Sequence, residues 1–244
     1  MYLFNYKRLW LIRLPVVLIP ACFFIFKLNT LWFGKRQGYF TGFIFYWLWC
    51  FLIPVTFIGW KEIGSLYSLR FPQIKKSKWL AAFLLILPLI FGYGFAFPKA
   101  IANAGSGIIV VSLLLAFVNA FLEELLWRGT FIKIFHANKF ICIFYAGSSF
   151  GIWHLVPLSF SATHVPGGMI SFIAFAVILG WLYGWIACCN KSIFWVTVSH
   201  VLLDFSGLGA RIYFNLNLLL WKLWKRLKNG SSPTLYQTLF LLCV

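Results

Sequence analysis

Apolar stretches of about 20 residues recur along this chain and constrain its fold more than any other feature. A stretch of that length can cross the hydrocarbon core of a membrane as a helix. In lipid the backbone must satisfy its own hydrogen bonds, so only helices and closed barrels are stable there. Because these stretches are continuous rather than alternating, they favour helices. We therefore predict an all-α, polytopic bundle of transmembrane helices with seven to eight crossings.

Glycine, proline and basic residues separate the apolar stretches and give the boundaries of the expected helices. The predicted spans are residues 9–33, 39–60, 79–98, 106–136, 140–156, 168–188 and 191–208, with a weaker pair near 212–225 and 234–244. No soluble domain fits between them. The prediction is one integral membrane domain, residues 1–244, in a multi-pass protein of the cell membrane.

The charge of the chain is strongly basic, with 21 Lys and Arg against 4 Asp and Glu. In a soluble protein this balance would suggest nucleic-acid binding. Here 62% of the residues are hydrophobic, and the basic residues collect between the apolar stretches, where they can anchor helix ends and meet anionic lipid headgroups. Membrane lipid, and not nucleic acid, is the predicted partner. The basic residues divide too evenly between the two sides to fix the orientation.

The acidic residues are informative because there are so few of them. Glu62 follows Lys61 at the end of a predicted helix, which indicates a solvated charge. Glu123, Glu124 and Asp204 lie within or beside apolar helices instead. A carboxylate at membrane depth costs about 2.5 to 3.5 kcal/mol, so such a group should face the bundle interior and have a partner. These three residues are therefore candidates for a functional site.

The first candidate motif lies around Glu123 and Glu124. Glu124 and Arg128 are four residues apart and share a helix face, which permits an ion pair. Glu123 points about 100° away, on the stripe that carries Asn119 and Trp127. One glutamate can thus be neutralised while the other stays available for chemistry. The alternative is that both acids only stabilise helix packing through Arg128.

The second candidate is His154, a single histidine in an apolar stretch. Such a histidine is usually a packing residue, but the depth of His154 in the membrane favours a functional role. Glu123 precedes Asn138 by the same number of residues as His154 follows Lys139. If 138–139 is the turn between antiparallel helices, both side chains lie about 22 Å from it, at one level in the membrane.

The third candidate is the pair His200 and Asp204, which project from one helix face because they are four residues apart. His200 lies about 15 Å from the same side of the membrane, which helix tilt can reconcile with the other two motifs. A purely structural pairing of these two residues remains the alternative. His136 and His164 fall near loops without acidic neighbours and are predicted to be non-catalytic.

These three motifs together resemble those of the CPBP family, which comprises CAAX proteases and bacteriocin-processing enzymes and includes the type II CAAX prenyl endopeptidases. The family carries EExxxR, FxxxH and HxxxN or HxxxD motifs on successive membrane helices. They stand here as Glu123-Glu124-Leu-Leu-Trp-Arg128, Phe150-Gly-Ile-Trp-His154 and His200-Val-Leu-Leu-Asp204. The motif-bearing core covers about residues 106–208, and the first hundred residues add nothing diagnostic.

The resemblance implies an intramembrane endopeptidase with a shared set of site residues. Glu123 with His154 would activate water, and His200 with Asp204 would bind the developing oxyanion. Glu124 and Arg128 would support the helix. Members have been called metalloproteases, and a divalent metal would be held by four residues: Glu123, His154, His200 and Asp204. No HExxH motif is present, so the expectation is a metal-free reaction that requires no cofactor.

The substrate and two other function classes stay open at this point. A prenylated CAAX tail, a bacteriocin leader and a pheromone precursor all fit, so the predicted partner is a membrane-associated peptide or lipidated protein. A non-catalytic bacteriocin-immunity or peptide-binding protein could use the same polar residues. An ion-coupled transporter also places acids and histidines in membrane helices, but no inverted repeat supports that class.

Overall fold

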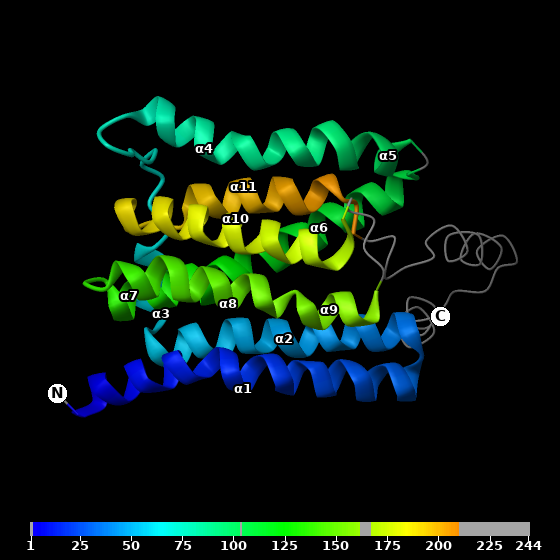
Figure 1. Cartoon of the computed structure of the whole chain (residues 1–244), viewed down its shortest axis with the longest axis horizontal. Helices are drawn as coiled ribbons and strands as arrows, with labels where there is room; N and C mark the ends of the chain where they lie inside the picture. The colour runs from blue at the N-terminus through cyan, green and yellow to red at the C-terminus, as the bar shows by residue number, and fades with distance from the viewer. Residues whose placement is uncertain (1, 103, 162–166, 210–244) are drawn as a thin grey trace, which may run out of the picture.

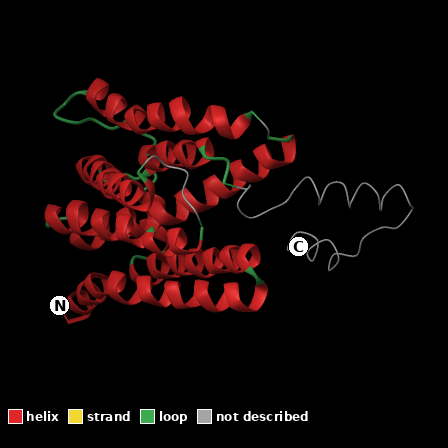
Figure 2. Cartoon of the chain, turned by 45° about the vertical axis from the view of Figure 1, so that its right-hand side comes forward, coloured by secondary structure: helices red, strands yellow, loops and turns green. Residues whose placement is uncertain are grey.

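The computed structural model describes residues 2–102, 104–161 and 167–209, and the named elements within these ranges are all helical (Figures 1 and 2). Its α-helices are α1 (Tyr2–Phe33), α2 (Lys35–Phe57), α3 (Trp60–Ser65), α4 (Lys78–Phe91), α5 (Phe97–Ile101), α6 (Ser106–Glu124), α7 (Phe131–Phe135), α8 (Ala146–Trp153), α9 (Leu155–Phe160), α10 (Gly168–Asn190) and α11 (Phe194–Ser206). Three wider π-helical segments join some of them: η1 (Gly92–Ala96), η2 (Leu125–Thr130) and η3 (Phe140–Tyr145).

The predicted helical membrane bundle is confirmed. In the described ranges, 6 helical spans are long and apolar enough to cross a membrane. The weaker pair near 212–225 and 234–244 lies outside the described residues. The predicted span at 191–208 is helical but shorter, because α11 has 13 residues. It is therefore about 20 Å long, less than the thickness of the hydrocarbon core. Its last residue, Ser206, is buried.

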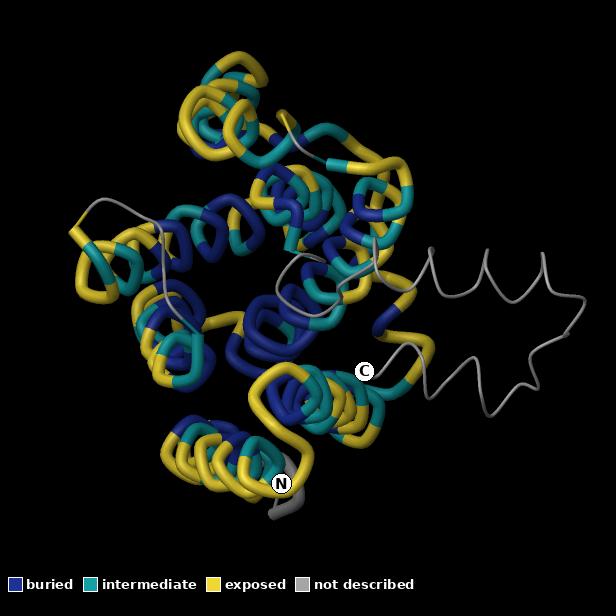
Figure 3. The backbone as a smooth tube through the Cα atoms, turned by 90° about the vertical axis from the view of Figure 1, so that its right-hand side faces the viewer, coloured by how far each residue is buried: buried dark blue, intermediate teal, exposed yellow. Residues whose placement is uncertain are grey.

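The long helices run roughly along one direction, with α1 and α2 side by side at one edge and α4 at the other (Figure 1). Helices α6, α8, α10 and α11 lie between these edges. Buried residues face the middle of the bundle and exposed residues face outward, most clearly on α1 and α4 (Figure 3). Large apolar side chains such as Val16 and Trp79 are exposed on this outer surface, as expected where lipid is the solvent.

Helices α8 and α10 approach closely through glycines. A Cβ atom built on Gly180 would lie 2.5 Å from the carbonyl oxygen of Gly147, and one on Gly151 would lie 2.7 Å from the backbone nitrogen of Val177. Small residues allow such backbone contact between membrane helices. The close packing fixes α8, which carries Phe150 and leads directly into His154.

A buried π-helical turn follows Glu124. All six residues of η2 are buried, and the Thr130 hydroxyl donates a hydrogen bond to the Leu125 carbonyl at 3.0 Å. Wide turns of this kind are frequent at functional sites. The Thr130 bond satisfies a carbonyl at the start of the turn that carries Trp127 and Arg128.

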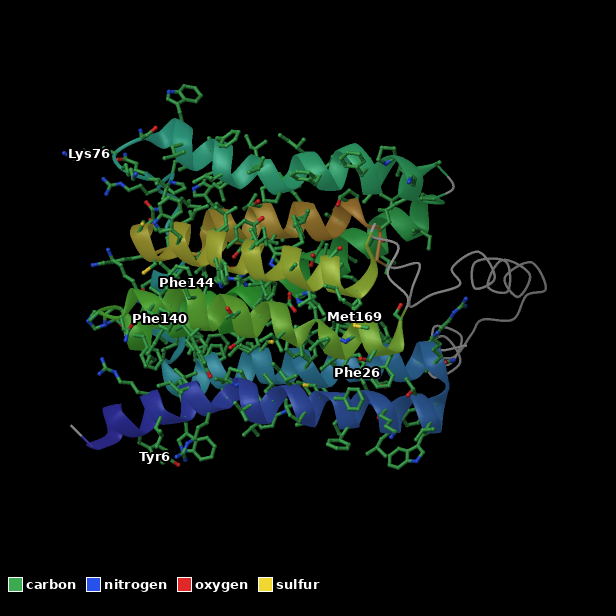
Figure 4. All side chains as sticks on the ribbon, viewed as in Figure 1. Tyr6, Phe26, Lys76, Phe140, Phe144 and Met169 are labelled. Atoms are coloured by element: carbon green, nitrogen blue, oxygen red, sulfur yellow. The ribbon has the colours of Figure 1, made fainter. Side chains whose placement is uncertain are left out.

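One end of the bundle is basic and solvated. It contains α3 and the loop with Lys76, which Figure 4 places at the same end as the N-terminus. Lys133 donates a hydrogen bond to Glu62 at 2.7 Å, and this bond lowers the pKa of the Glu62 carboxyl from its ordinary value. The Glu62 side chain is 51% exposed, so the predicted solvated charge is confirmed, with Lys133 as its partner.

Candidate active site

His200 brings the acidic residues of α6 and α11 together. Its Nδ1–H donates to Glu124 Oε1 at 2.8 Å, while its Nε2 lies 3.4 Å from Asp204 Oδ1 and 3.7 Å from Glu123 Oε2. The imidazole thus lies among three carboxyl groups. The predicted convergence of the first and third motifs is present, and the His200–Asp204 pair shares one face as expected. We call the group Asn119, Glu123, Glu124, Arg128, His200 and Asp204 the polar cluster.

Glu124 has two partners. Arg128 Nη1 lies 3.1 Å from its Oε1, so the ion pair predicted from the four-residue spacing forms, and both side chains are buried. The second partner, His200, was not expected, because a contact over 76 residues leaves no local pattern. Glu124 therefore neutralises Arg128 and also holds the ring of His200 in one orientation.

Phe150 explains the aromatic position of the second motif. The Arg128 guanidinium lies 4.0 Å from the centre of the Phe150 ring, a cation–π contact that stabilises a buried charge. The same ring lies 4.8 Å from that of His154 and 5.7 Å from that of His200, centre to centre. Phe150 therefore connects the three motifs physically.

His154 has a defined tautomer. Its Nδ1 lies 2.9 Å from the Phe150 carbonyl oxygen. A carbonyl can only accept, so Nδ1 carries the hydrogen, and Nε2 of the neutral ring is left with a lone pair. The second motif thus presents a nitrogen that can accept a proton.

Asn119 links the two catalytic candidates on α6 and α11. Its Nδ2 donates to Glu123 Oε2 at 3.1 Å and to Asp204 Oδ2 at 2.9 Å. Trp47 Nε1 donates to the Asn119 carbonyl oxygen at 2.8 Å. The shared stripe of Asn119 and Glu123 was visible in the sequence, whereas no sequence signal pointed to Trp47.

Aromatic residues close the buried side of the site. Trp127 Nε1 donates to the Tyr46 hydroxyl at 2.7 Å, and the Tyr46 ring stacks on Trp153 with 3.6 Å between ring centres. All three side chains are fully buried. Helix α2 thus builds part of the site, although the first hundred residues carry no motif.

Comparison with known families supports the resemblance. Residues 105–206 match the family model described as type II CAAX prenyl endopeptidase Rce1-like. This segment is therefore similar to the Rce1-like CAAX proteases, and we call it the Rce1-like segment. The Rce1-like segment contains every residue of the polar cluster together with Phe150 and His154, and it supports a CAAX-type endopeptidase activity within the membrane. No curated protein and no solved structure matches the chain.

Several lone pairs of the polar cluster that a metal ion would need are engaged by N–H donors or by a neighbouring carboxylate. Within residues 2–102, 104–161 and 167–209, no three His, Cys, Asp or Glu side chains are grouped to hold a metal ion. The amide hydrogens of Asn119 point at Glu123 and Asp204, so a cation between these carboxylates would meet N–H donors rather than lone pairs. His200 Nδ1 is already bound to Glu124.

His136 does not join the site. His136 is exposed at the turn between α7 and η3, where the sequence predicted a helix–helix turn. His164 lies outside the described residues. For His136 the structure therefore agrees with the predicted non-catalytic role.

Proposed function

We propose that this chain is an intramembrane endopeptidase of the cell membrane that hydrolyses a peptide bond with water activated by Glu123 and His154. The observation that carries the proposal is the position of His200 among Glu123, Glu124 and Asp204, next to the Phe150–His154 pair. Glu123 is deep within the apolar span Ser106–Phe135, where a cluster of ionisable groups indicates function rather than packing.

Glu123 and His154 are suited to accept protons. The Glu123 side chain is 1% exposed, and its Oε2 is oriented by Asn119. His154 offers the lone pair of Nε2, since Nδ1 donates to the Phe150 carbonyl. A carboxylate and a neutral imidazole can take the proton of an attacking water and return it to the leaving amine. We assign the water-activating role to Glu123, with His154 as its partner.

His200 is suited to stabilise the oxyanion of the tetrahedral intermediate. Its Nε2 lies 3.4 Å from Asp204 Oδ1 and 3.7 Å from Glu123 Oε2, and both distances exceed the usual N–H···O separation of about 3 Å. In the protonated ring, which carries a hydrogen on each nitrogen, Nε2–H is therefore free to donate to a developing negative charge, whereas Nδ1–H is held by Glu124. Asp204 orients the ring, and Glu124 with Arg128 supports it from the other side.

A substrate can reach the cluster at Asp204. The Asp204 side chain is 28% exposed, while Glu123, Glu124 and His200 are each at most 4% exposed. Because Glu123 of the polar cluster lies on the apolar span Ser106–Phe135, we expect the substrate to be a peptide held within or against the membrane. We propose a CAAX-like lipidated tail, a bacteriocin precursor or a pheromone precursor as the substrate class.

The test is hydrolysis of a panel of such peptides by the purified protein in detergent. We expect wild-type turnover, loss of at least about 100-fold in Glu123→Gln, and no loss in Glu62→Gln, the matched change at a solvated site. Glutamine keeps the shape of glutamate but cannot accept a proton. More than a tenth of wild-type turnover in Glu123→Gln would remove this residue from the mechanism. Tight peptide binding without turnover in the wild type would favour the non-catalytic immunity or peptide-binding class.

A further inference from the structure

Asn119 lies outside the three sequence motifs, yet its side chain contacts both carboxylates that face the proposed reaction. The two bonds from its amide nitrogen, 3.1 Å to Glu123 Oε2 and 2.9 Å to Asp204 Oδ2, use both N–H groups. Glu123 is on α6 and Asp204 is on α11. The amide therefore sets the separation of two carboxylates on different helices.

The amide of Asn119 can make these bonds in only one orientation. A half-turn about its last side-chain bond would direct the carbonyl oxygen at two carboxylates and the NH₂ group at an N–H donor. Trp47 prevents this, because its indole Nε1–H donates to the Asn119 carbonyl oxygen at 2.8 Å. An indole N–H can only donate, so it is an unambiguous orienting group.

We infer that Asn119, oriented by Trp47, is a positioning residue that holds Glu123 and Asp204 in register for catalysis. This inference rests on the proposed peptidase function. It also assigns a role to α2, which lies outside the Rce1-like segment at residues 105–206. Like-charged carboxylates repel each other in a low-dielectric interior, and the two N–H donors between them offset that repulsion. Without the donors, the Glu123 carboxylate turns away from its productive position.

The first experiment compares kcat and KM for Asn119→Asp, Trp47→Phe and two controls. Aspartate keeps the shape of asparagine but replaces the two donors with a third negative charge. We expect kcat to fall about 100-fold with KM unchanged, the signature of a misplaced reactive group. Trp47→Phe should lower kcat less, since the amide remains but can rotate. The controls are Asn138→Asp at an exposed turn and Trp49→Phe on the exposed face of α2, and both should be neutral.

The second experiment exchanges the amide of residue 119 and the carboxylate of residue 204. In the double variant Asn119→Asp/Asp204→Asn, the amide of residue 204 can donate to the carboxylate of residue 119, which still accepts from Trp47. The number of negative charges returns to that of the wild type. We expect the double variant to recover at least about tenfold in kcat over Asn119→Asp alone, as coupled neighbours are non-additive. A double variant as slow as that single variant would overturn the inference, as would an Asn119→Asp variant with unchanged kcat.

A stability measurement separates failure of this inference from failure of the peptidase proposal. Thermal midpoints in detergent are measured for the wild type, Asn119→Asp, Asp204→Asn and the double variant. These four proteins form a double-mutant cycle that needs no activity. A double variant with a midpoint above the value that the two single changes add up to supports the positioning role of Asn119 even if no peptide is cleaved. Additive midpoints would contradict it whether or not the wild type is a peptidase.

Discussion

The centre of the bundle and the end that carries α3 contain the same kinds of residue in opposite surroundings. In the centre, Glu124 and Arg128 are 0% and 1% exposed, and their ion pair spans 3.1 Å. At the end, Glu62 and Lys133 are 51% and 28% exposed, and theirs spans 2.7 Å. The shorter pair is the more solvated one, so distance alone says little about what each pair contributes.

The surroundings of each ion pair decide what its charges contribute to stability. At the solvated end, water and salt screen the attraction, and either partner remains hydrated when the other is removed. In the centre, an unpaired charge has no water to replace its partner. There Arg128 pairs with Glu124, and Glu124 also holds His200. This makes the centre sensitive to substitution and the α3 end tolerant.

The largest expected effect follows from Arg128→Ala. Removing the guanidinium takes away the ion-pair partner of Glu124, and breaking a buried pair typically costs about 3 to 5 kcal/mol of unfolding free energy. We expect low yield and a much lower thermal midpoint in detergent. Lys133→Ala, the matched change at the α3 end, should leave the midpoint unchanged. A stable Arg128→Ala protein that binds peptide poorly would instead give Arg128 a role in substrate binding.

A smaller effect is expected from Gly180→Ala. The new Cβ would lie 2.5 Å from the Gly147 carbonyl oxygen, which is backbone and cannot swing aside. Overpacking of this kind costs about 1 to 3 kcal/mol and shifts α8, so turnover should fall together with the thermal midpoint. Gly64→Ala in α3 is the control, because its Cβ would meet no atom within 4 Å. Equal midpoints for the two variants would contradict the close contact between α8 and α10.

The smallest effect is expected from Thr130→Val, which removes one buried hydrogen bond to the Leu125 carbonyl while keeping the shape. The cost should be about 0.5 to 1.5 kcal/mol, and Thr130→Ser should restore most of it. Ser65→Ala removes two exposed bonds, one to the Glu62 carbonyl and one from Lys133, and should change nothing measurable in the same thermal assay. A neutral Thr130→Val would show that the wide turn needs no side-chain support.

Local spacing predicted much of this architecture from the sequence. The apolar stretches indicated the helical spans, and the four-residue spacings indicated the Glu124–Arg128 and His200–Asp204 pairs. The expected turn near Asn138 lies between α7 and η3. In each case a single helix or hairpin carries the information, so the constant rise per residue of an α-helix suffices to place the side chains.

The remaining contacts depend on how separate helices pack, which local spacing does not encode. The Trp47–Asn119 bond joins residues 72 apart, and the His200–Glu124 bond joins residues 76 apart. The wide turn at η2 was also not predicted, because the expected span 106–136 runs through Leu125 to Thr130 as one regular helix. The part played by α2 was missed for this reason.

The most direct test of the metal-free account is the turnover of Asp204→Asn, measured with and without a strong chelator beside the wild type and Asp204→Ala. Asparagine keeps the shape of aspartate and an oxygen that accepts from the Asn119 amide, while its own N–H can donate to the developing oxyanion beside His200. We predict that Asp204→Asn retains substantial turnover, that Asp204→Ala does not, and that chelator leaves the wild type unaffected. An asparagine variant as inactive as the alanine variant, together with chelator inhibition of the wild type, would contradict the account and make Asp204 an anionic metal ligand.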